Sequence, residues 1–223
     1  MARNHYTLFH WFAEPTIYNA TSNPYYYLTM SKLTRKDLYS LEEYSEIRDE
    51  YRKKVMAHKE NRRLELGNHL MLSFEDQLIM QYQVQEMLKA EKIFDAAGIE
   101  EELEAYNPLI PDGCNWKATM LIQYTDVEER QKQLARLIGI ENLIWMQVNG
   151  FDKVYAISDE DLERDTAEKT SAVHFMRFEL DSDMSTAVKA GAAISAGVEH
   201  ENYQAAVSPV ASNLRDSLAA DLA

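Results

Sequence analysis

The dipeptide Asn149-Gly150, between the apolar runs LIWMQV and VYAIS, is the feature that most constrains the fold of this chain. Asn-Gly is typical of a two-residue hairpin turn, because both residues accept the positive φ that such a turn requires. A second pair, Gly67-Asn68, interrupts LELGNHLMLSFE, in which large apolar residues alternate with other residues on both sides of the pair. Two hairpins predict a sheet that is mostly antiparallel.

Helical patterns separate these hairpins. Ser40 and Glu43 fit a capping box, and apolar residues follow at spacings of three and four to about Lys59. A second helix is expected from Gln77 to a cap at Gly98, and the acidic, proline-containing residues 100–116 are expected to form a loop. Further strands are expected at 117–124, 168–180 and 193–203, and further helices at 126–140, 184–192 and 208–222. This order predicts an α+β fold, a mixed, mostly antiparallel sheet with helices packed on it in a single domain.

Residues 1–29 differ from the rest, because they are rich in aromatic residues and carry only Arg3 and Glu14 as charges. We interpret them as an N-terminal extension, added by an upstream start codon or an expression vector, and residues 30–223 as the single α+β domain. The alternative is an arm that packs its aromatic side chains on a partner chain, since those side chains are unfavourable in water.

The composition excludes several classes of function. A formal net charge of −14 repels nucleic acid backbones and anionic lipid surfaces. Cys114 is the only cysteine, so one chain has neither an internal disulfide nor a cysteine-based metal cluster, which fits a reducing cytoplasm. No apolar run approaches the roughly 18 residues of a membrane span. The motifs of dinucleotide, P-loop, zinc-hydrolase and α/β-hydrolase sites are also missing.

The most unusual stretch is EKTSAVHFMRFEL, residues 168–180, an apolar strand pattern that contains a histidine and an arginine. Alternation places His174 on one face and Arg177 on the other. Two interpretations follow. In the structural one, Arg177 pairs with Glu86 or Glu91 of the second helix, and its loss would cost about 3–5 kcal/mol. In the functional one, His174 lines a cleft as general acid or base, and Arg177 or Lys169 holds an anionic substrate.

A metal site is a further hypothesis. His69, His174 and His200, together with Glu86 and Glu91, offer the mixture of nitrogen and oxygen ligands that suits Fe, Mn or Zn. Nothing in their spacing forces these residues together, so the divalent ion stays a hypothesis of a mononuclear site. Glu86 is also a candidate catalytic carboxylate.

Five stretches together resemble an uncharacterised bacterial family, domain of unknown function number thirty-five-oh-one, in matching order from Met30 to about Leu222. They are LTRKDLYSLEEYSEIRDEYR, YQVQEMLKAEKI, AYNPLIPDG, EKTSAVHFMRFEL and AGVEHENY. The resemblance places the following residues among the family's matching positions without giving them roles: Glu86, Glu91, Asn107, Asp112, Lys169, His174, Arg177 and His200. Genes of the family tend to neighbour those of a rubrerythrin-like di-iron protein and an iron–sulfur oxidoreductase, which implies redox or peroxide defence.

The leading hypothesis is therefore an accessory protein of such a redox system, which docks a partner through the loop from Tyr106 to Gly113 with Asn107 and Asp112. The alternatives are a small enzyme with a His174-centred pocket for an anionic substrate, and a metal-binding protein. Whether the chain forms a homo-oligomer is left open.

Overall fold

The computed structural model describes residues 32–160, 162, 164, 166 and 168–223, and the predicted extension 1–29 lies outside them. The helices are α1 (Leu41–Glu60), α2 (Gln77–Glu91), α3 (Ala96–Tyr106), α4 (Val127–Arg136), α5 (Ser182–Lys189) and α6 (Ser212–Ala219). The strands are β1 (Arg63–Leu66), β2 (Leu70–Glu75), β3 (Asn115–Ile122), β4 (Ile144–Val148), β5 (Lys153–Tyr155), β6 (Ile157–Ser158), β7 (Val173–Glu179), β8 (Ile194–His200) and β9 (Tyr203–Val207). Three short 3-10 helices are η1 (Arg35–Asp37), η2 (Asn107–Leu109) and η3 (Ile140–Leu143).

The strands form two sheets, in the orders β1-β2-β3-β7-β6 and β5-β4-β8-β9, and neighbouring strands in both are antiparallel. The predicted α+β class is confirmed, with the strands divided between two sheets rather than placed in one. Both predicted hairpins are present, as β1–β2 around Gly67 and β4–β5 around Gly150, and both glycines have positive φ. After β5 the chain crosses from one sheet to the other at the buried Ala156.

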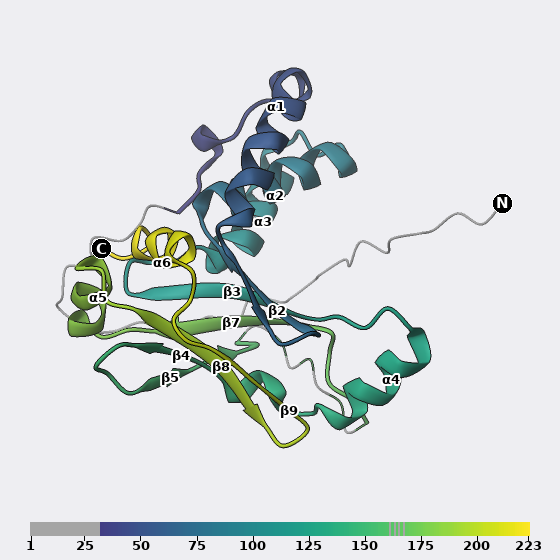
Figure 1. The fold of residues 1–223 in the computed structure, drawn as a ribbon. Helices are drawn as coiled ribbons and strands as arrows, with labels where there is room; N and C mark the ends of the chain where they lie inside the picture. The colour runs from purple at the N-terminus through teal and green to yellow at the C-terminus, as the bar shows by residue number, and fades with distance from the viewer. Residues whose placement is uncertain (1–31, 161, 163, 165, 167) are drawn as a thin grey trace, which may run out of the picture.

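The main core lies between the two sheets. Leu72, Met120 and Phe178 face inward from the first sheet, and Met146 and Ala196 face them from the second. In Figure 1, α5 and α6 lie at one end of the sheets and α4 lies at the other end. Each large apolar side chain that is buried in this way contributes about 1.5–3 kcal/mol to folding.

Helices α1, α2 and α3 gather on one side of the sheets and have apolar clusters of their own (Figure 1). The predicted capping box of α1 is confirmed, because Ser40 accepts from the Glu43 amide while Glu43 accepts from the Ser40 amide. Among the described residues, no helix is both long and apolar enough to cross a membrane.

The second predicted helix ends earlier than expected. Lys92 takes the left-handed conformation (φ 58°) and ends α2, and Asp95 then caps α3 by accepting from the Gly98 amide at 3.0 Å. Gly98 is therefore in the first turn of α3, and the prediction that it caps the second helix is wrong. The acidic residues expected in a loop form α3, since an aspartate at the N-cap starts a helix wherever helix-forming residues follow.

Candidate functional site

Strand β7 presents His174 and Arg177 to opposite faces of its sheet, as alternation predicted. His174 lies opposite Met120 in β3 and is fully enclosed, with 0% of its surface exposed. Arg177 lies opposite Lys117 on the outer face and remains partly exposed. The two side chains therefore serve separate environments.

His174 lies within a buried polar network. Its Nδ1 is 2.6 Å from Asp159 Oδ2, and its Nε2 is 2.9 Å from Thr170 Oγ1 and 3.0 Å from the Ser171 carbonyl oxygen. The other Asp159 oxygen accepts from Arg164 at 2.8 Å. The prediction that His174 lines a cleft is therefore wrong. General acid or base catalysis requires contact with the reacting group, whereas this ring ties the segment before β7 to the core.

Arg177 pairs with carboxylates near its own strand. Its Nε and Nη2 each donate to Glu160 at 2.8 Å, and its Nη1 donates to Glu179. The predicted partners were wrong, because Glu86 lies on α2, where it accepts from Tyr44 and Arg48 of α1. The hydrogen bonds from Arg48 lower the pKa of Glu86. Burial acts in the opposite direction, and the hydrogen bond from Tyr44 lowers the pKa further.

We call one set of polar residues the loop face: Asn107 and Asp112 between α3 and β3, together with the ion-paired Glu160, Arg177 and Glu179. The side-chain amide of Asn107 clamps the backbone of Leu33. It accepts from the Leu33 N–H at 2.8 Å and donates to the Leu33 carbonyl oxygen at 3.0 Å. Asp112 accepts from the backbone amide of Cys114 at 3.2 Å, and the Cys114 thiol lies 3.4 Å from Glu179. A chain of contacts thus joins the loop before β3 to the ion pairs of β7.

Two neighbours of the loop face have shifted pKa values. Burial, together with hydrogen bonding to Asp112, raises the pKa of the Cys114 thiol to about 12, so this cysteine stays protonated and unreactive near neutrality. Burial, and next the adjacent Arg177 guanidinium, lowers the pKa of Lys117. Tyr106, which is predicted to bind a partner, packs partly buried against the apolar cluster formed by α2 and α3.

The metal-site candidates lie in different environments. His69 Nδ1 is 3.0 Å from the Gln123 carbonyl oxygen, and His200 Nε2 is 3.2 Å from the Ile138 carbonyl oxygen. His174 is held by Asp159, and Glu86 by Arg48, while Glu91 is the last residue of α2. Within the part of the chain that the structure describes, no three His, Cys, Asp or Glu side chains are grouped to hold a metal ion. Lys169 is exposed in the segment before β7.

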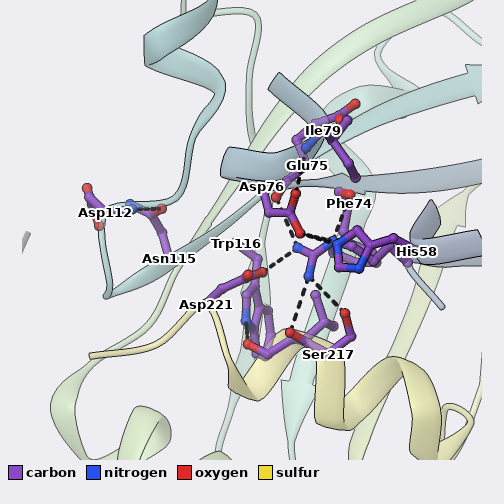
Figure 2. A network of polar contacts seen from close by, with 12 residues as sticks. His58, Phe74, Glu75, Asp76, Ile79, Asp112, Asn115, Trp116, Ser217 and Asp221 are labelled. Atoms are coloured by element: carbon purple, nitrogen blue, oxygen red, sulfur yellow. Dashed lines mark hydrogen bonds and ion pairs between the residues drawn. The ribbon is translucent and has the colours of Figure 1, made fainter. Parts of the chain in front are cut away.

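The predictions missed a second buried network, which centres on Arg62 and whose other members are labelled in Figure 2. Its guanidinium is 1% exposed and donates to the carbonyl oxygens of Phe74 and Glu75 at 3.1 and 3.0 Å. It also donates to Ser217 Oγ at 2.9 Å and to Asp221 Oδ2 at 2.5 Å. Burial outweighs the attraction of Arg62 and raises the pKa of Asp221 to about 6.

The same network extends into the helices. Asp76, the N-cap of α2, lies 3.4 Å from Arg62 Nε and 2.5 Å from His58 Nε2 of α1. In Figure 2, Asp76 lies above the centre of the network, Asp221 to its left and Ser217 below it. The network therefore connects α1, α2, β2 and α6. One sequence signal indicates this network. Leu64 and Leu66 face inward, and the same alternation continued two residues toward the N-terminus puts Arg62 on the core side.

Comparison with known proteins identifies the family of this chain. The family model described as protein of unknown function (DUF3501) matches residues 32–222. The chain belongs to the DUF3501 family. A crystal structure at 1.90 Å, of a novel protein of unknown function from Burkholderia pseudomallei K96243, is 50% identical with a TM-score of 0.82. The match covers 86% of this chain and 100% of that chain. Among curated proteins, no relative matches.

We propose that residues 30–223 form the folding domain of this DUF3501 protein and that residues 1–29 lie outside it. The family match begins at residue 32, which supports this division. A chain that begins at Met30 is expected to keep its melting temperature to within about 8 °C, because roughly 1 kcal/mol shifts a domain of this size by 2–4 °C. Differential scanning calorimetry of both chains measures this, and a larger drop would show that the extension packs on the domain.

Proposed function

We propose that this chain is an accessory protein that docks a redox partner through the loop face. The partner classes are those that the family resemblance implies: a rubrerythrin-like di-iron protein or an iron–sulfur oxidoreductase. Asp112 contacts the Cys114 thiol, which lies 3.4 Å from Glu179, and this link to the ion pairs of β7 supports the choice of surface. The enclosure of His174 favours this hypothesis over a His174-centred enzyme.

The observation that carries the proposal is the arrangement of charges around Arg177. The side chains of Glu160 and Glu179 are 49% and 43% exposed, and that of Arg177 is 22% exposed. Exposed ion pairs contribute little to stability, typically about 0–1 kcal/mol. Fixed charges at a surface do, however, steer association and select partners. A role in partner recognition therefore explains better than a role in stability why two carboxylates hold this arginine.

The backbone beneath the loop face is also held in place. The Ala223 amide donates to the Gly113 carbonyl at 2.8 Å, and Leu222 forms a parallel bridge with Gly113. Together with the Asn107 clamp on Leu33, these contacts fix both ends of the loop between α3 and β3. A loop that is ordered before binding loses less conformational entropy when it binds, which favours its use as a docking element.

The test is the affinity of Glu160→Lys for purified rubrerythrin-like protein and purified iron–sulfur oxidoreductase from the same genome, measured by isothermal titration calorimetry. The wild-type chain is expected to bind one of them. The variant is expected to bind at least about tenfold more weakly, because the bidentate partner of Arg177 is lost and a charge is reversed.

The matched control is Glu50→Lys, which makes the same charge change at an exposed position of α1. Helix α1 extends away from the sheets, so this variant is expected to bind as the wild type does (Figure 1). Failure of the wild-type chain to bind either partner, or equal affinities for the two variants, would contradict the proposal.

A further inference from the structure

A groove of about 620 Å³ lies where β2 begins and β3 ends. Its lining includes Asn68, His69, Gln123, Tyr124 and Arg130. It is separate from the loop face, since none of its lining residues belongs to that surface. No lining residue is acidic, although the whole chain carries a net charge of −14. Arg130 is the one lining residue with a permanent charge, and its guanidinium is a group that suits an anion.

His69 has a fixed orientation in this groove. Its Nδ1 lies 3.0 Å from the carbonyl oxygen of Gln123, and a carbonyl only accepts, so Nδ1 carries the hydrogen. Its ring stacks on Tyr124, with the centroids 4.1 Å apart and the planes at 13°. In the neutral ring, Nε2 is then an acceptor whose position is set by both contacts.

Arg130 of α4 supplies the positive charge. It is half-buried, and its Nη1 lies 3.5 Å from the carbonyl oxygen of Tyr124, which is a weak contact. A guanidinium has five N–H donors, so most of them are left for a ligand after this contact. Its planar fork matches the two oxygens of a carboxylate.

We propose that this groove binds a small hydroxycarboxylate. Arg130 pairs with the carboxylate, and the hydroxyl group of the ligand donates to Nε2 of His69. In this arrangement the guanidinium of Arg130 meets the anionic end of the ligand, and the oriented Nε2 of His69 accepts the hydroxyl hydrogen. It is independent of the docking proposal, because it involves other residues on another part of the fold.

The experiment is an NMR titration of the histidine ring resonances with lactate at about pH 8, where histidine side chains are ordinarily neutral. The His69 signals are identified by their loss in His69→Ala. Lactate is expected to shift them saturably. Propionate, which differs from lactate only in lacking the hydroxyl group, is expected to bind several-fold more weakly. Arg130→Gln is expected to weaken lactate binding at least about tenfold, because a charged hydrogen bond is lost.

Arg63→Gln is the matched control, since it makes the same change at an exposed arginine of β1 outside the groove. It is expected to bind lactate as the wild type does. Arg130→Lys keeps the charge and is expected to bind better than Arg130→Gln, which separates a binding defect from a folding defect. The absence of a saturable shift, equal binding of propionate, or unchanged binding by a folded Arg130→Gln would each overturn the proposal.

Discussion

Replacing Arg62 with alanine is expected to lower the free energy of unfolding by about 3–5 kcal/mol, the range for removing one partner of a buried ion pair. The variant leaves the Asp221 carboxylate buried without its cation, and it also leaves the carbonyl oxygens of Phe74 and Glu75 without their side-chain donors. The contact between α6 and the rest of the network is lost at the same time, because Ser217 no longer has a donor there. Urea denaturation followed by circular dichroism measures the change.

Arg63→Ala is the control for this prediction. Arg63 is the next residue in the chain but is exposed, so its loss is expected to change the free energy of unfolding by no more than about 0.5 kcal/mol. If Arg62→Ala were no more destabilising than Arg63→Ala, the network would not be the cross-link between helices and sheets that its contacts indicate.

His174→Ala is expected to lower the free energy of unfolding by about 2–4 kcal/mol. Two effects add: an enclosed ring is removed from the core, and buried polar partners lose their hydrogen bonds. Asp159 keeps Arg164 as a partner, which limits the loss, whereas Thr170 loses its contact with the ring. The same urea denaturation measures this change, together with the loss of tertiary signal in the near-ultraviolet spectrum.

Val173→Ala is the matched control on the same strand. Val173 is 36% exposed on the opposite face of β7, so its truncation leaves no enclosed cavity. Val173→Ala is expected to lower the free energy of unfolding by well under half as much as His174→Ala does. Equal costs would mean that His174 is not part of a network on which the core depends.

The elements that could be predicted from sequence are those with local chemical signals. The Ser40 capping box set the start of α1, and Asn149-Gly150 set the β4–β5 hairpin. The break between α2 and α3 was missed because Lys92 adopts a left-handed conformation that glycine usually takes. The strand predicted at 193–203 covers β8 and ends where β9 begins, so β9 was missed, since Glu201-Asn202 is a weaker turn signal than Asn-Gly.

For the candidate site, the sequence predicted which face of β7 each side chain occupies but not which residues that side chain contacts. Alternation along β7 correctly separated His174 from Arg177, because period-2 geometry is local. The partner of Arg177 depends on which chain segment lies beside β7, and that segment contains Glu160 rather than Glu86. The enclosure of His174 likewise depends on the Asp159 segment, whose placement no local pattern specifies.

We propose that the ion pairs of the loop face serve recognition of a partner rather than stability. The free energy of unfolding of Arg177→Ala tests it most directly, because the side chain is partly exposed and both of its carboxylate partners remain hydrated without it. The expected loss is at most about 1 kcal/mol, as for exposed ion pairs. A loss of about 3–5 kcal/mol, as for a buried pair, would contradict the claim and make Arg177 a structural residue.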